Sequence, residues 1–374
     1  MTRHIRHNRG LTLIDVLIAV FCIVLILAVV LPVTGQVRKS TDVVVSMSNL
    51  ASLGVAHALY AADWKGRQFT NIPDDISTYG YDFDDAFDMY EYVHGEPVPP
   101  LLLGWGCDED DQCGLWAYWM DHPGNRGLTL PINFTEPLHL ISFGSFRIPN
   151  AKPFHDYVAG RFYEPTFYAP NDPVPYGLVE QAFDEPDEFV PWLVDDGPLY
   201  WSSYCFSPAA MLHPNVMRSE PEGGWQNPWT IMEGFQSPAF SQALYPELKT
   251  HIIEHHWNQD APPDPCNPNF CNGTYDGCEP YYFNHAYASA PATLFYDMSV
   301  RLLPNSEVLT ADQWLMNQTG YGLWSRDTPF GEDGYFSDFG YDFTQLSHHI
   351  LTTDGIRGRD TVSFTAPHSA RAHQ

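Results

Sequence analysis

The chain has 374 residues, and its 46 acidic against 18 basic side chains give a formal net charge of −28. Clustered lysine and arginine are absent beyond residue 40, which excludes a surface built to bind nucleic acid or anionic lipid. An aromatic share of 15% with 11 Trp excludes a largely disordered chain. The length and the 44% hydrophobic content suit one large or two modest domains.

The first segment is a basic leader followed by a long apolar run. Arg3, Arg6 and Arg9 precede Gly10, and the eighteen residues 16–33 carry no charge. That length is about the lower limit for an α-helix that crosses roughly 30 Å of hydrocarbon. The run therefore predicts a membrane helix. Asp15 stands near its start, where an ionised carboxylate costs a few kcal/mol, so we expect a partner opposite it.

The start of the apolar run follows a recognisable pattern. Gly10 is followed by Leu11 and Thr12-Leu13, by the acid Asp15 at the fifth position after the glycine, and then by an apolar helix that contains Pro32. The pattern resembles the class III signal of type IV pilins and type II secretion pseudopilins. The resemblance implies that prepilin peptidase cuts after Gly10 and that Leu11 becomes the N-methylated terminus. It also implies that Asp15 neutralises the terminal amine of a neighbouring subunit during filament assembly. Leu11 and Asp15 replace the usual Phe and Glu, which favours processing over efficient filament packing.

Two alternatives to this signal stay open. An ordinary secretory signal would be cleaved after residues 33–35, Val-Thr-Gly, although the apolar run is longer than the 7–15 residues typical of such signals. An N-terminal anchor that is never processed is the second alternative. Under either of them Asp15 would have no role in assembly.

The apolar helix is expected to continue without interruption to residue 63. Its second half carries apolar residues three and four positions apart, which predicts an amphipathic helix packed on a sheet: Val44, Met47, Ala51, Val55, Ala58 and Ala62. Pro32 should kink it or locally loosen it, and Gly66 should end it. The run 48–67 resembles the same part of a large planctomycete-type pilin-like family.

The rest of the chain reads as short strands among long loops. Strands are expected at 138–146 and 199–206, irregular structure at 70–100 and 164–198, and two strands within 292–303 around a turn at Asp297-Met298. The same pilin-like family ends its core with His, nine residues and Asp-Gly. Here eleven residues separate His285 from Asp297, and Met298 replaces the glycine. A turn that needs a positive φ is unfavourable for methionine.

Six cysteines lie outside the membrane helix, an even number that suits disulfides in an oxidising compartment: Cys107, Cys113, Cys205, Cys266, Cys271 and Cys278. Fifteen pairings are open. Local pairs, Cys107 with Cys113 and two of the last three cysteines, are the ones we favour. A zinc site made by the last three with His285 is an alternative whose spacing fits no tight zinc knuckle.

The loop between Cys107 and Cys113 holds four carboxylates: Asp108, Glu109, Asp110 and Asp111. Carboxylate oxygens in a constrained loop suit Ca²⁺, so these residues are candidate ligands for that ion. A solvated acidic turn is the simpler interpretation. The many Tyr and Trp residues allow stacking on glycans, although packing accounts for most of them.

His251, Glu254 and His255 match the inverted zinc-protease pattern His-x-x-Glu-His. In that pattern two histidines at helical spacing bind Zn²⁺ and the glutamate activates water. With sixteen histidines in the chain, coincidence is the favoured explanation. We expect a solvated or capping histidine cluster near the end of a helix.

Together these features predict an α+β fold in which a long N-terminal helix packs on an antiparallel sheet with long irregular loops. The expected parts are a leader (1–10), a membrane helix (11–33), its amphipathic continuation (34–66), a periplasmic or extracellular domain (67–364) and a disordered tail (365–374). The expected function is structural, not enzymatic: a major or minor pilin-like subunit, single-pass in the inner membrane with a cytoplasmic N-terminus. Its partners would be prepilin peptidase, other pilin-like subunits and the inner-membrane assembly platform. An anchored Ca²⁺- or glycan-binding module that does not polymerise is the alternative, and an anchored zinc hydrolase is a third.

Overall fold

The fold consists of one long helix and a domain built on its second half. The computed structural model describes residues 13–121, 123–134, 144–193, 199, 201–255, 289–330 and 351–363. In the first half of the long helix it describes the side chains of Val20 and Phe21 only. The helices are α1 (Leu13–Asp63), α2 (Phe83–His94), α3 (Pro123–Thr129), α4 (Lys152–His155), α5 (Pro173–Val179), α6 (Pro208–Met211) and α7 (Asn305–Thr319). The strands are β1 (Leu101–Cys107), β2 (Cys113–Tyr118), β3 (Tyr204–Phe206), β4 (Thr250–Glu254), β5 (Ala292–Phe295) and β6 (Val300–Leu302).

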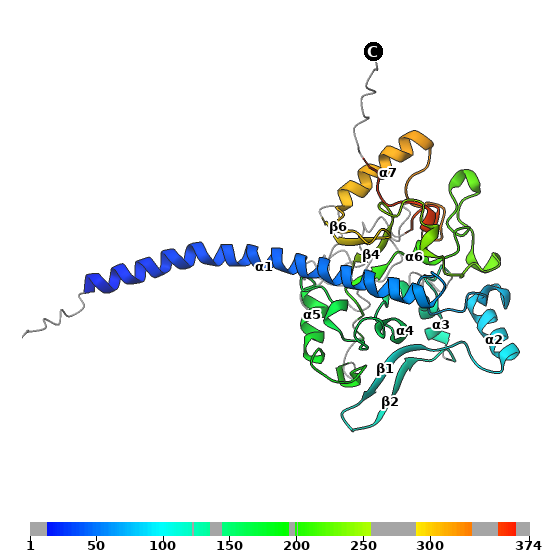
Figure 1. Cartoon of the computed structure of the whole chain (residues 1–374), viewed down its shortest axis with the longest axis horizontal. Coiled ribbons are helices and arrows are strands. Elements are labelled where there is room, and N and C mark those ends of the chain that lie inside the picture. The colour runs from blue at the N-terminus through cyan, green and yellow to red at the C-terminus, as the bar shows by residue number, and fades with distance from the viewer. Residues whose placement is uncertain are drawn as a thin grey trace, which may run out of the picture.

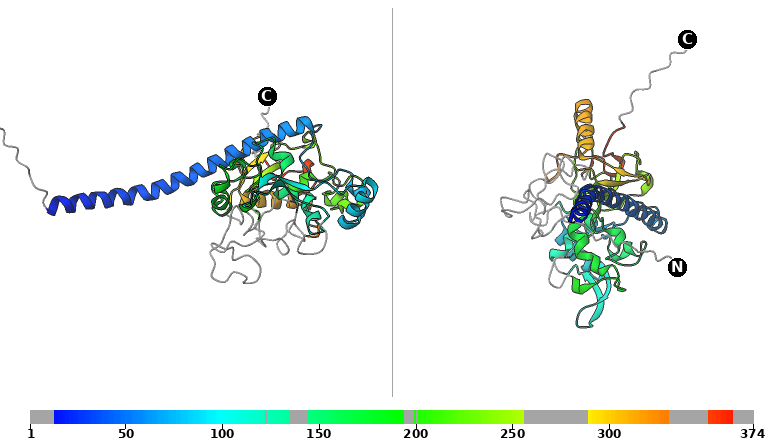
Figure 2. Two further views of the ribbon diagram at one scale, coloured as in Figure 1. Left: turned by 90° about the horizontal axis from the view of Figure 1, so that it is seen from below. Right: turned by 90° about the vertical axis from the view of Figure 1, so that its left-hand side faces the viewer.

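Helix α1 is continuous over 51 residues, close to the expected range. Its first half projects from the domain, and its second half lies along one side of it (Figure 1). The helical backbone passes through Pro32 without a break, and the whole helix curves gently (Figure 2). The sequence predicted that Pro32 kinks or locally loosens the helix; the structure shows a continuous helical backbone there, and local loosening stays a prediction. After Asp63 the chain turns through Lys65 and Gly66, whose φ angles are 57° and 79°, so the predicted helix end is confirmed.

The two sheets are both antiparallel, which confirms the α+β class. The four-stranded sheet has the order β3-β4-β5-β6, and the other is the hairpin β1-β2. Strands β4 and β5 are buried along their whole length. Helix α1 packs against β5 and β6, so the sheet and the second half of α1 enclose the main core.

Strand predictions met with mixed success. The hairpin within 292–303 is confirmed as β5 and β6. The strand expected at 199–206 is reduced to Tyr204–Phe206, and Ser145–Arg147, at the end of the strand expected at 138–146, form a 3-10 turn. Residues 138–143 lie outside the described residues. Apolar content does not tell a short strand from a buried 3-10 turn, and this is why the prediction failed at Ser145–Arg147.

Met298 occupies the turn between β5 and β6 with φ 68°. A left-handed conformation costs a residue with a Cβ roughly 1 kcal/mol more than it costs glycine. We therefore expect Met298→Gly to raise the free energy of unfolding by about 0.5–1 kcal/mol, measured by thermal denaturation. Met232→Gly, at an exposed position in a loop, is the control and should bring no gain. A loss of stability in Met298→Gly would contradict the strain argument.

Candidate functional site

The second half of α1 is the best candidate for the functional element. Within the described residues, Ser40–Asp63 is the one helical segment long and apolar enough to cross a membrane, with a mean hydropathy of 1.4, yet only 39% of it is buried. This half of the helix is apolar on two faces. One face contacts the sheet and the other does not.

The inner face of α1, as we name it, consists of the buried residues Ser46, Leu50, Leu53, Gly54, His57, Tyr60 and Ala61. A Cβ at Gly54 would lie 3.2 Å from both terminal methyl carbons of Leu294 on β5. The small residue therefore lets the helix approach the sheet closely. Leu50 and Leu53 are completely buried and belong to the main core cluster.

A buried polar cluster fixes the position of α1 along the sheet. Ser46 Oγ donates to Glu254 Oε1 on β4 at 2.6 Å, and the Ala292 N–H donates to Glu254 Oε2 at 2.9 Å. Asn49 Nδ2 donates to the carbonyl oxygens of Pro165 and Tyr168 at 3.2 and 3.1 Å. Buried polar groups with matched partners specify one register of helix against sheet.

Two histidines meet where α1 crosses β4. His57 and His251 are both buried, and their ring centroids lie 4.3 Å apart in an edge-to-face arrangement. His251 is the extra residue of a β-bulge between Thr250 and Ile252, and its ring also packs against Tyr296 and Phe240. No described group hydrogen-bonds to the ring nitrogens of either histidine. Burial lowers the pKa of His57 well below its usual value and that of His251 to about 3.

This pair predicts that acid destabilises the domain. The unfolded imidazoles bind protons near pH 6.5, while the buried rings resist protonation, and Lys249 further lowers the pKa of His251. The stability from neutral histidines is thus complete above pH 6.5 and is lost as the pH falls below it. Near pH 5, unfolding should take up about two more protons in the wild type than in His57→Phe/His251→Phe.

The measurement is the melting temperature of both proteins between pH 4 and 8. His94→Phe replaces an exposed histidine on α2 and is the control. Its melting temperature should change with pH as that of the wild type does. If the melting temperatures of the wild type and the double variant fell equally with decreasing pH, the result would contradict the argument. The Tyr60 and Tyr296 hydroxyls near the pair do not titrate in this range, because burial raises both pKa values.

The outer stripe of α1, as we name it, faces solvent and consists of Val44, Ala51, Val55, Ala58, Leu59 and Ala62. Val44, Val55 and Leu59 are 64%, 63% and 54% exposed. The sequence prediction assigned most of this stripe to the sheet contact and is wrong. Both faces carry small or apolar residues at helical spacing, so the period alone does not tell which one the sheet covers. In the projecting half, Val20 and Phe21 are 54% and 63% exposed.

The residues of the predicted processing signal are only partly described. Gly10 and Leu11 lie outside the described residues, while Asp15 and Pro32 lie within α1. Cys107 and Cys113 form the predicted disulfide, at opposite positions on β1 and β2. Cys205 is buried in β3. The remaining candidates, Cys266, Cys271, Cys278 and His285, lie outside the described residues.

The four carboxylates of the disulfide-closed loop do not converge. Asp108 Oδ1 accepts the N–H groups of Asp110 and Gln112 at 3.0 and 2.8 Å, so it serves the turn itself. Glu109, Asp110 and Asp111 are exposed. In the part of the chain that the structure describes, no three His, Cys, Asp or Glu side chains are placed to hold a metal ion.

The zinc-protease interpretation of His251, Glu254 and His255 is wrong in its geometry. All three are buried in or directly after strand β4, not on a helix or in a solvated cluster as expected. The motif needs its two histidines one helical turn apart on a single face, and a bulged strand does not provide that. Glu254 is instead hydrogen-bonded to α1 and to the backbone of β5.

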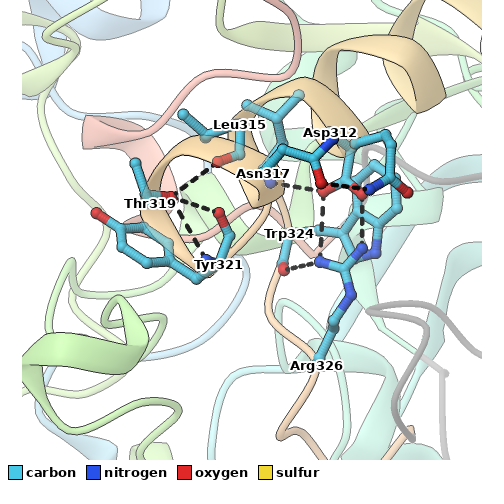
Figure 3. A network of polar contacts seen from close by, with 9 residues as sticks. Asp312, Leu315, Asn317, Thr319, Tyr321, Trp324 and Arg326 are labelled. Atoms are coloured by element: carbon cyan, nitrogen blue, oxygen red, sulfur yellow. Dashed lines mark hydrogen bonds and ion pairs between the residues drawn. The ribbon is translucent and has the colours of Figure 1, made fainter.

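A second polar network joins the middle of α7 to the segment that follows the helix (Figure 3). The Asp312 carboxylate accepts from Arg326 Nη2 at 2.6 Å and from the Leu323 N–H at 2.7 Å, and the guanidinium lies over the Trp324 ring. A Cβ at Gly322 would overlap Asp312 Oδ1, so a larger residue there would displace the carboxylate from its partners. Because the carboxylate is fully engaged, we assign this network to stability.

Comparison of the chain with protein-family models, with curated proteins and with solved structures finds no match.

Proposed function

We propose that this chain is a pilin-like structural subunit of a type IV pilus-like or type II secretion-like filament, anchored by α1 and processed by prepilin peptidase. The work of such a subunit is assembly, not catalysis. The observation that carries the proposal is the outer stripe of α1. A soluble domain buries the apolar face of its core helix, whereas this helix leaves a second apolar face exposed after its first face is covered.

The composition of that face suits packing between helices. Ala51, Ala58 and Ala62 are small, and small residues let helix backbones approach closely. Val55 and Leu59 are 63% and 54% exposed and supply apolar area to bury. The stripe lies on the same continuous helix as the uncharged run 16–33, so one partner surface would extend from the membrane segment onto the domain.

The N-terminal pattern adds the chemistry of assembly to this surface. After cleavage behind Gly10, the new amine of Leu11 would carry a positive charge inside an apolar environment. Asp15 of a neighbouring copy would neutralise that charge, which offsets the cost of placing either group in hydrocarbon. The domain would then face the periplasm or the outside of the filament, with its acidic surface in water.

The test is the N-terminal residue and its mass in protein taken from native membranes. The proposal requires a chain that begins with N-methylated Leu11. A chain that begins at Met1 would identify an unprocessed anchor, and one that begins near Gln36 would identify a secreted protein. Either result would overturn the proposed function.

A further inference from the structure

A pocket of about 440 Å³ is lined by residues at the C-terminal end of α1 and directly after it. This end of the helix lies on the domain, opposite the end that projects (Figure 1). The size of the pocket falls within the roughly 300–1,000 Å³ typical of small-molecule sites. Its apolar wall is made by one aromatic residue in the last turn of α1, by another directly after the helix, and by prolines from three other segments: Tyr60, Trp64, Pro73, Pro99, Pro100 and Pro153. The assembly surface described above leaves this pocket unexplained.

Trp64 presents an aromatic face at this pocket. Its indole stacks on Tyr60 with ring centroids 5.6 Å apart and planes inclined by 18°. Tyr60 is 5% exposed, while Trp64 remains 56% exposed. A large exposed tryptophan held rigidly by a buried neighbour has the properties of a stacking platform, because little conformational entropy is lost when a ring packs on it.

The polar groups of the pocket are few and of mixed character. Asn71 Nδ2 is buried and has no hydrogen-bond acceptor among the described residues. Arg67 pairs with Asp74, and both side chains remain about one-third exposed, at 34% and 37%. The residues that line the pocket thus combine a buried amide donor that has no partner with a paired donor and acceptor that are partly exposed. A buried donor without a partner costs free energy that an incoming acceptor recovers.

From these features we propose that the pocket binds a neutral saccharide unit. A pyranose ring has an apolar C–H face that packs on an indole, and its edge hydroxyls both donate and accept hydrogen bonds. The face would lie on Trp64, one hydroxyl oxygen would accept from Asn71, and others would meet Arg67 and Asp74. The net charge of −28 disfavours anionic sugars. A proline-rich peptide fits less well, because one exposed tryptophan between proline walls does not form the aromatic ridges that such peptides need.

This inference goes beyond the proposed structural role and does not depend on it. The experiment uses the full chain in a detergent without a sugar headgroup. The probes are N,N′-diacetylchitobiose, cellobiose, maltose and lactose. Binding of each is measured by saturation-transfer NMR and by the change in tryptophan fluorescence. At least one disaccharide should bind, with a Kd that Trp64→Ala raises by ten-fold or more, that Asn71→Ala raises several-fold and that Trp64→Phe largely restores.

The matched control is Trp105→Ala. Trp105 is 53% exposed on β1 and does not line the pocket, so its removal should leave the Kd unchanged. If Trp64→Ala fails to fold, Asn71→Ala against the wild type decides the matter. The proposal is overturned if no disaccharide binds, if Trp105→Ala weakens binding as much as Trp64→Ala, or if a proline-rich decapeptide binds the pocket while the sugars do not.

Discussion

Replacing Lys249 with Met is expected to lower the free energy of unfolding by about 3–5 kcal/mol. Lys249 is completely buried, and its Nζ lies 3.0 Å from Asp360 Oδ2. It also donates to Ser207 Oγ at 2.9 Å and to Thr352 Oγ1 at 2.5 Å. The substitution would leave the Asp360 carboxylate buried without a counter-charge, and only the hydrogen bonds from the Thr250 N–H and the Thr352 hydroxyl would offset its desolvation cost.

The control for this prediction is Lys152→Met. Lys152 also pairs with a carboxylate, Glu188 Oε1 at 2.8 Å, but its side chain is 24% exposed, so we expect a loss of no more than about 1 kcal/mol. Denaturant unfolding of both variants is the measurement. The double variant Lys249→Met/Asp360→Leu should recover much of the loss, since neither charge remains buried. Equal losses in the two single variants would contradict the account.

Leu59→Glu is expected to abolish assembly while leaving the domain folded. The side chain of Leu59 is 54% exposed in the outer stripe, so the change removes no core contact, and surface changes of this kind usually cost less than about 0.5 kcal/mol. In a filament the same position would bury a carboxylate between helices, which costs several kcal/mol per subunit. Assembly repeats that cost at every contact.

Val93→Glu supplies the matched control, because Val93 is 57% exposed on α2 and is not part of the outer stripe. The measurement is the yield of high-mass assemblies from membranes, with the melting temperature recorded in parallel. We expect Leu59→Glu to reduce the yield at least ten-fold and Val93→Glu to leave it unchanged. Normal assembly of Leu59→Glu would show that the outer stripe is not a contact surface.

The existence of α1 could be predicted from the sequence, but not the face that it buries. Apart from Pro32, the apolar run and its amphipathic continuation follow helical patterns up to Gly66, and local rules suffice to predict a helix from them. The choice between the inner face and the outer stripe depends on whether Leu294 and Glu254 lie beneath the helix, and these residues are far away in the chain. The contact of His57 with His251 was missed for the same reason.

Short strands and motifs were predictable only where local geometry decides them. The turn at Asp297-Met298 joins two strands that pair with each other, so the hairpin could be predicted. The His-x-x-Glu-His match failed because the spacing implies a metal site only on a helix. A five-residue segment rich in β-branched residues gives no periodicity long enough to tell helix from strand.

The most direct test of assembly through α1 is photo-cross-linking in native membranes, with a benzophenone amino acid placed at residue 55 in one protein and at residue 93 in another. Both positions are exposed in the folded domain. If the outer stripe packs against other copies of this chain, Val55 will give a ladder of dimers and higher oligomers, and Val93 will give monomer. Monomer alone from residue 55, or equal ladders from both positions, would contradict the account.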